Sequence, residues 1–222
     1  MERNWKETIE MLWEKEKWYW LAAVVIGLSF SLIFGAHWTK GYSEMIQKGI
    51  GAKVVRFHVL ANSDSEEDQT LKLAVRDAVL QEYGDLLSAC ENKEETLLAL
   101  ENAQQEICET AAEVVAEKGY DYPVGVSIVR EEFPFKRYGD LIFPAGVYDA
   151  LRIEIGEAEG QNWWCVLYPQ MCFVDAAWGY TTEESHRRLE NTLTEEEFLI
   201  VSALEQDSLK PKIKLKLLEL WQ

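Results

Sequence analysis

Residues 53–61, KVVRFHVLA, alternate between apolar and polar side chains. Val55, Phe57 and Val59 share one face and Arg56 and His58 the other, because neighbouring side chains of a strand point to opposite faces. The alternation predicts a half-buried strand with one polar face. The chain is helical in pattern after this strand, and we expect the folded domain to begin here.

Two helices are predicted directly after the strand. Ser63-Asp64-Ser65-Glu66 has the S-x-x-E pattern of a capping box, and apolar residues recur at three- and four-residue steps from about 64 to 89. A second apolar stripe runs from about 93 to 118 and ends at Gly119. We expect an antiparallel helical hairpin, with the polar face of the first strand turned away from it.

The period changes to two after residue 123. Five short runs, separated by Pro, Gly and Asn, read as strands: GVSIVRE, DLIF, VYDALRIEIG, WWCVLY and MCFVD. The predicted fold class is α+β, an antiparallel or mixed sheet with the helical hairpin on one face, preceded by one transmembrane helix. A short helix is expected from Thr194 into FLIVSAL. The final run, KIKLKLLELW, fits either a strand or an amphipathic helix.

A stretch of 22 residues between Lys17 and Lys40 contains no Lys, Arg, Asp or Glu. At about 1.5 Å per residue it covers roughly 30 Å, the thickness of a bilayer core, and aromatic residues lie at both ends as in interfacial belts. We expect a transmembrane or signal-anchor helix at 18–39. A cleaved signal peptide is the alternative, but Phe34-Gly35-Ala36 is a poor cleavage site.

Four basic residues precede the span and four follow it within a comparable distance, so their number does not decide the orientation. Lys15 and Lys17, which adjoin the span, and the short amino tail favour an amino terminus inside the cell. We expect four segments: a cytoplasmic tail at 1–17, the span at 18–39, a linker at 40–52 and a single extracytoplasmic domain at 53–222. That exported part would be membrane-anchored or secreted.

The chain is acidic, with a formal net charge of −17. The residues after position 39 include 34 acidic and 18 basic ones, which leaves −16 on the predicted exported part. Such a surface repels phosphate backbones and anionic lipid, since nucleic-acid binding depends on neutralising phosphates with Lys and Arg. Nucleic acid is therefore excluded as a partner.

The cysteines divide into two kinds. Cys90 and Cys108 would stand about 20 Å apart along the helical hairpin, too far for a disulfide, so we expect small core residues. Cys165 and Cys172 fall opposite each other in a hairpin centred on Tyr168-Pro169. We expect a structural disulfide there, which an exported compartment permits. Two free core thiols, or a reactive or metal-binding pair, are the alternatives.

Enzyme signatures are missing from the sequence. It contains no G-x-S-x-G, H-E-x-x-H, Gly-rich phosphate loop or C-x-x-C motif. We therefore expect no catalytic residues, no metal site, no cofactor and no enzymatic activity.

One surface combines cations, a carboxylate and aromatic rings, the mixture enriched in protein interfaces. It is the sheet face opposite the helices, where the first strand and RIEI both present polar side chains. If Tyr148 and one of the two tryptophans also lie there, the candidate partner-binding residues are Arg56, His58, Tyr148, Arg152, Glu154, Trp163 and Trp164. The alternative is an ordinary polar outer face with internal ion pairs.

Two long blocks resemble a known family. RFHVLANSDSEEDQTLKLAVRDAV at 56–79 and YGDLIFPAGVYDALRIEIGEAEGQNWWCVLYPQMCFVD at 138–175 are similar to the stage II sporulation protein R family of endospore-forming bacteria. The resemblance covers roughly residues 53–178. It implies a signalling protein exported into the space between the forespore and mother-cell membranes.

The resemblance also implies a partner. There the family activates a membrane-embedded aspartic protease of the mother cell, the stage II sporulation GA protein, which processes the sigma-E precursor. On this interpretation the chain is a ligand. The alternative from the residues alone is a membrane-anchored module that binds cell-wall polymer through its aromatic side chains.

Overall fold

The computed structural model describes residues 5–172 and 183–202, with side chains from residue 16 onward. The chain divides into two compact units, Met1–Ile46 and Gln47–Gln222. The predicted linker at 40–52 is helical in the structure.

A single long helix forms the described part of the first unit. Helix α1, Trp5–Lys53, has the predicted apolar run within it. The part from Glu16 onward is long and apolar enough to cross a membrane. A membrane anchor and a signal sequence both have this property. The rest of the described chain leaves its apolar side chains uncovered; Phe30, for example, is 72% exposed. The predicted apolar helix is therefore present.

The second unit contains six strands and four helices in addition to the end of α1, within the described residues. In chain order these are β1 Val55–Leu60, α2 Glu66–Ser88, α3 Lys93–Glu117, β2 Val124–Phe133, β3 Lys136–Tyr138, β4 Leu141–Phe143, β5 Gly146–Ile155, β6 Asn162–Tyr168, α4 Glu183–Thr192 and α5 Glu195–Ser202. The predicted α+β class is confirmed. Helix α4 was not predicted, because its polar sequence has no apolar stripe.

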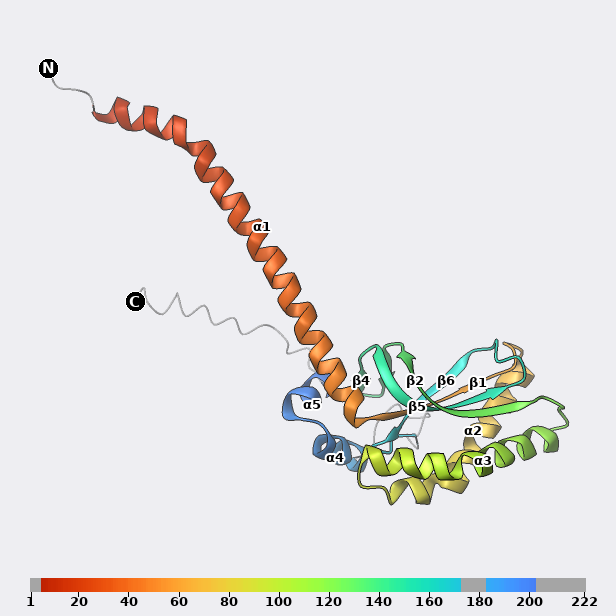
Figure 1. Ribbon diagram of the computed structural model, residues 1–222. Coiled ribbons are helices and arrows are strands. Elements are labelled where there is room, and N and C mark those ends of the chain that lie inside the picture. The colour runs from red at the N-terminus through yellow and green to blue at the C-terminus, as the bar shows by residue number, and fades with distance from the viewer. Residues whose placement is uncertain (1–4, 173–182, 203–222) are drawn as a thin grey trace. The chain divides into compact units, whose positions relative to one another are not determined.

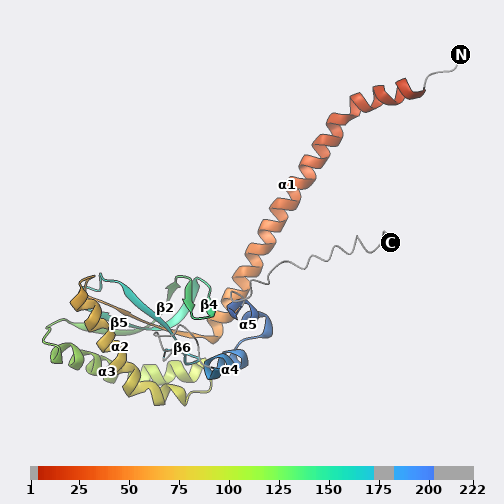
Figure 2. The same cartoon turned by 180° about the vertical axis from the view of Figure 1, so that it is seen from behind.

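The main sheet is mixed, in the order β2-β5-β1-β6. Strand β1 pairs in parallel with β5 and antiparallel with β6, and β5 pairs antiparallel with β2. The predicted DLIF strand is β4, but it pairs with β3 in a separate two-stranded sheet. Figures 1 and 2 show α2 and α3 together on one side of the main sheet and the β3–β4 hairpin on the other.

The helical hairpin covers one sheet face, as predicted. Val55, Phe57 and Val59 from β1 pack with the apolar stripes of α2 and α3 in one continuous core. Helix α2 starts two residues later than expected, because Ser65 is the N-cap, accepting from Asp68 N at 3.1 Å. The predicted cap Ser63 instead donates its hydroxyl to the Asp68 carboxylate at 2.5 Å.

The opposite face of the main sheet, which we call the outer face, is covered only in part. The β3–β4 hairpin lies over one end and buries Leu141, Ile142 and Phe143 there. Helix α5 packs next to β4. The other end of the outer face has no helix or strand over it within the described residues.

The predicted disulfide is present between Cys165 and Cys172, with Cα atoms 5.5 Å apart. Cys165 lies in β6, but Cys172 follows a turn that begins with a cis bond between Tyr168 and Pro169. The expected MCFVD strand is thus not formed at Met171–Cys172, and the rest of it falls outside the described residues. Cys90 and Cys108 carry free thiols.

Replacing both Cys165 and Cys172 with Ser should lower the free energy of unfolding by about 2 to 2.5 kcal/mol, because the bond closes a short loop and restricts the unfolded chain. Urea denaturation of the full chain under non-reducing conditions would measure the loss. The control, Cys90→Ser with Cys108→Ser, should change it far less. Equal stability of wild type and the Cys165/Cys172 variant would contradict this expectation.

Candidate functional site

Four side chains form a row across the uncovered part of the outer face. The strand register places Ser127 beside Arg152, Arg152 beside His58, and His58 beside Trp164. Side chains at directly paired positions on one sheet face lie about 5 Å apart. The row thus brings together residues from four strands that are far apart in the sequence.

His58 is buried in the middle of this row. Its ring stacks on Trp164, with centroids 4.9 Å apart and an angle of 6° between the planes, and it meets Phe133 edge to face. Nε2 lies 2.5 Å from Glu131 Oε1. Burial lowers the pKa of His58, and the opposing effect of Glu131 does not restore it. The ring is therefore neutral at pH 7.

Arg152 connects two carboxylates on the same face. Its guanidinium lies 3.4 Å from Glu131 Oε2 and 3.3 Å from Glu154 Oε2, and all three side chains are about 30% exposed or slightly more. These half-exposed ion pairs contribute little to stability on their own. They do hold the arginine in one orientation at the edge of the open surface.

Two polar atoms in this row are buried without a hydrogen-bond partner within the described residues. They are Ser127 Oγ and Arg152 Nε. Buried polar groups in folded proteins nearly always have a partner, and leaving one unpaired costs about 1–3 kcal/mol. The open part of the outer face therefore has hydrogen-bonding capacity that water or a partner can fill.

Arg56 lies under the covered part of the outer face and is fully buried. Its guanidinium carbon is 4.8–5.6 Å from the centres of four aromatic rings, those of Phe133, Tyr148, Phe143 and Tyr138. Nε donates to Cys165 O at 3.1 Å and Nη2 to the Tyr138 hydroxyl at 2.7 Å. No carboxylate among the described residues pairs with it. Aromatic faces and two hydrogen bonds thus replace the usual counter-ion.

Burial shapes the titration of this aromatic cage. It lowers the pKa of Arg56 and raises the pKa of Tyr138, and it raises the pKa of Tyr148 to about 12. Both phenols are therefore neutral at pH 7, and Tyr148 donates its hydroxyl to Pro144 O at 2.8 Å. The cage ties β1, β2 and β5 to the β3–β4 hairpin.

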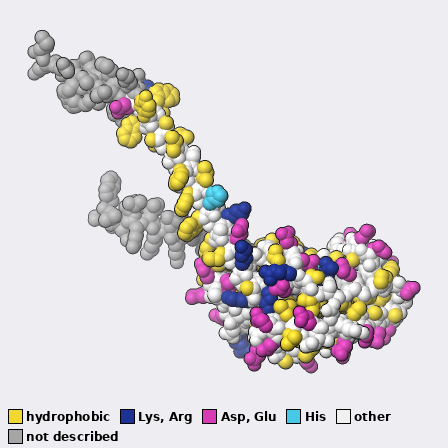
Figure 3. Space-filling view, viewed as in Figure 1, with side chains coloured by type: hydrophobic (Ala, Val, Ile, Leu, Met, Phe, Trp, Pro, Cys, Tyr) yellow, Lys and Arg dark blue, Asp and Glu magenta, His cyan; other side chains and the backbone are white. Residues whose placement is uncertain are grey.

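A basic side chain borders the open surface: Lys136 of β3 has its Nζ 5.4 Å from the Trp164 ring centre. Arg130 lies on the helix side of β2, where it pairs with Asp149 at 3.2 Å. Figure 3 shows Lys and Arg side chains interspersed with Asp and Glu side chains on the visible face of the domain.

The structure divides the predicted site residues into three groups. His58, Arg152, Glu154 and Trp164 lie together at the open part of the outer face. Arg56 and Tyr148 share that face but are buried under the hairpin. Trp163 lies on the helix side, edge to face with Phe57 at 5.6 Å and under Arg76 at 4.8 Å.

The sequence did not indicate Ser127, Glu131, Phe133, Tyr138 or Asn162. Their position depends on which strands pair and in what register, and the alternation of one strand does not contain that information. The FPF sequence at 133–135, an aromatic pair around a proline, was the available signal for a turn that brings the hairpin over the sheet.

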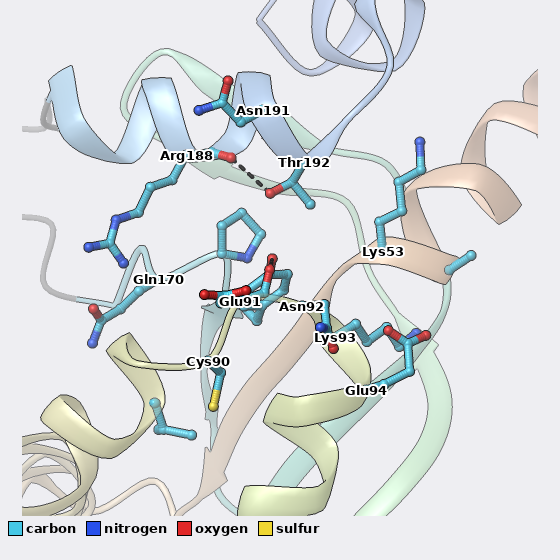
Figure 4. Close-up of a pocket in the computed structure, with 14 residues that line it drawn as sticks. Lys53, Cys90, Glu91, Asn92, Lys93, Glu94, Gln170, Arg188, Asn191 and Thr192 are labelled. Atoms are coloured by element: carbon cyan, nitrogen blue, oxygen red, sulfur yellow. Dashed lines mark hydrogen bonds between the residues drawn. The ribbon is translucent and has the colours of Figure 1, made fainter.

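A second surface hollow lies at the other end of the domain. Figure 4 shows it between the end of α1 (Lys53), the α2–α3 connection (Cys90–Glu94), the turn after β6 (Gln170) and α4 (Arg188, Asn191, Thr192). The polar side chains around it include none of the buried unpartnered atoms found in the described residues. Nor do those residues contain a cluster of three potential metal ligands. The outer face is therefore the better candidate site.

Replacing Tyr138 with Phe should lower the free energy of unfolding by about 1–3 kcal/mol, because Nη2 of Arg56 would remain buried without its acceptor. Urea denaturation measures this, with Tyr120→Phe on the helix side as the control. An unchanged midpoint would show that Arg56 does not depend on this hydroxyl.

Stability should fall as the pH drops below about 6.5, because the unfolded chain protonates His58 at a higher pH than the folded chain does. The stabilisation is complete above that pH and is lost as pH falls toward the lowered pKa. Urea midpoints between pH 7.5 and roughly 5.5 would show the decline in wild type and in His186→Gln, and a flatter profile in His58→Gln. Parallel profiles would contradict the assignment.

Comparison with known proteins confirms the family resemblance. The sequence model of the family described as stage II sporulation protein R matches residues 51–178. The stage II sporulation protein R of Bacillus subtilis (strain 168) is 35% identical over 161 residues, which cover 70% of this chain and 72% of that protein. No solved structure matches. The chain therefore belongs to the stage II sporulation protein R family.

Proposed function

We propose that this chain is an exported sporulation signal that activates a membrane-embedded aspartic protease, the stage II sporulation GA protein, and so starts processing of the sigma-E precursor. On this proposal the chain acts as a ligand and performs no chemistry itself. Family membership and the apolar amino-terminal helix support this function. The disulfide fits a domain that lies outside the cytoplasm.

The observation that carries the binding proposal is the open part of the outer face. There Arg152 is held by two carboxylates, Trp164 contacts both His58 and Lys136, and two polar atoms lack partners within the described residues. Aromatic and arginine side chains dominate the binding energy of protein interfaces. This surface is the one in the described domain that combines them with unfilled hydrogen-bonding capacity.

Activation by such a ligand is a matter of differential binding. The ligand shifts the protease toward its active form only as far as its affinities for the two forms differ. Only contacts that are stronger with the active form of the protease therefore contribute to its activation. Arg152 and Lys136 fit acidic groups of the protease. Glu131 and Glu154 already pair with Arg152, so the partner competes with internal ion pairs.

The activity would be tested by processing of a tagged sigma-E precursor in a non-sporulating host that carries the protease, with and without this chain. Processing should require the chain and its apolar segment. Absence of processing from a folded, exported chain would overturn the proposal.

The outer face would be tested in the same host. Arg152→Ala and Trp164→Ala should each reduce processing at least tenfold, since interface residues of this kind contribute about 1–2 kcal/mol or more. Lys118→Ala, at the exposed end of α3 on the helix side, is the control and should process normally. Circular dichroism of the purified variants separates loss of binding from loss of folding. Full processing by both folded variants would place the contact elsewhere.

A further inference from the structure

Strand β2 is an edge of the main sheet, because the order β2-β5-β1-β6 gives it a single neighbour (Figure 1). It pairs with β5 in one continuous register over its whole length, Val124–Phe133, and contains no proline. Its ten residues exceed the five or six of a usual strand. A long, regular edge presents a row of backbone N–H and C=O groups to which another strand can pair, and proteins usually block such an edge.

The register shows which backbone groups of β2 point away from β5. Gly156 N donates to Pro123 O at 2.9 Å, so the backbone of Pro123 faces β5. Successive residues of an antiparallel strand direct their N–H and C=O groups alternately toward one neighbour and the other. The residues whose groups face outward are therefore the even-numbered ones, Val124, Val126, Ile128, Arg130 and Glu132.

Only the first part of this outward edge is occupied within the described residues. Two side chains of α3 reach it: the Gln104 amide donates to Val126 O at 2.8 Å, and the Cys108 thiol donates to Val124 O at 3.4 Å. The outward backbone groups of the other three residues have no hydrogen-bond partner in the described parts of the chain. These three residues, Ile128, Arg130 and Glu132, form what we call the open edge.

The opposite edge of the sheet, formed by β6, is better protected. Strand β6 runs directly into the turn that the disulfide closes, and Met171 N in that turn donates to Val166 O at 3.1 Å. Its pairing with β1 also shifts register near the end of the strand, an irregularity that makes an edge a poorer template for pairing. Of the two edges, β2 is therefore the one prepared for a further strand.

The open edge borders the candidate site, and this position indicates which side chains a paired strand would need. Every second side chain of such a strand would lie on the outer face, beside Ser127, whose hydroxyl is buried without a partner within the described residues. An oxygen acceptor there would receive that hydroxyl. The alternate side chains would lie on the helix side, beside Ile128, which packs against the core but is only partly buried. An apolar side chain there would complete its burial.

We propose that an extended segment of the receptor pairs with the open edge as a fifth strand of the main sheet. Its backbone bonds to the outward groups of Ile128, Arg130 and Glu132, and its side chains alternate between oxygen acceptors on the outer face and apolar groups on the helix side. A second copy of this chain fits less well, since each copy carries 34 acidic and 18 basic residues after position 39 and two copies repel. The inference rests on the proposed function for the identity of the receptor.

Hydrogen exchange tests the open edge directly, because pairing protects backbone amides. The full chain in detergent would be measured alone and with the protease, by mass spectrometry that resolves single residues. The amides of Ile128, Arg130 and Glu132 should exchange rapidly in the chain alone and at least about tenfold more slowly with the protease. Binding without this slowing would overturn the strand pairing and leave the proposed function standing, whereas absence of binding would overturn both.

Exchange in the chain alone identifies the other possible occupants. Slow exchange at every concentration would mean that a segment of the chain itself fills the edge. Slowing that appears only as the concentration of the chain rises would mean that a second copy does. Either result would overturn the proposal.

Arg130→Pro tests the same pairing in the host that carries the protease. Proline removes the outward N–H and places its ring on the edge, and an edge strand tolerates it where the N–H faces away from the sheet. Processing of the sigma-E precursor should fall about tenfold or more. The matched control, Arg130→Ala, keeps the N–H but removes the ion pair with Asp149, and should process within about twofold of wild type.

The two Arg130 variants separate the backbone from the side chain. Equal processing by both folded variants, at any level, would show that the backbone N–H is not used and would overturn the strand pairing. Circular dichroism of the purified variants checks their folding. If Arg130→Pro does not fold, the exchange of the wild-type chain decides the question.

Discussion

The burial of Arg56 at the centre of the sheet constrains the rest of the domain. A guanidinium on the middle strand cannot reach water, and a buried charge without compensation is costly. Compensation comes from four rings and two hydrogen-bond acceptors, and these are contributed by β2, β4, β5, β6 and Tyr138 of β3. The small β3–β4 sheet therefore lies where it does because its aromatic residues complete this cage. By covering one end of the outer face, it also defines the part that stays open.

The sequence predicted the fold class, the helical hairpin and the apolar helix, since each rests on a local period of side chains. It placed Arg56, His58, Arg152 and Glu154 on one face for the same reason. It could not separate Arg56, which is buried, from Arg152, which is half-exposed, because that difference depends on the hairpin formed by residues 136–143. It could not choose between Trp163 and Trp164 either, since only the register with His58 decides between adjacent positions.

The family match covers most of the compact unit Gln47–Gln222. Residues 51–178 include all six strands, helices α2 and α3, the disulfide and the outer face. Helices α4 and α5 lie beyond the match. The features proposed for binding a protein partner therefore belong to the part matched by the family.

The disulfide has a consequence beyond local stability. The turn that it closes also contacts the helical hairpin: the Tyr168 hydroxyl donates to Glu91 O at 2.6 Å and the Gln170 amide to Gly84 O at 3.3 Å. Cys165 itself adjoins the cage, since its carbonyl accepts from Arg56. Formation of this one disulfide bond thus fixes the end of β6, which contacts both the helical hairpin and the aromatic cage around Arg56. A newly made chain in a reducing environment would lack this disulfide bond. The domain therefore reaches its final rigidity only after the two thiols have been oxidised.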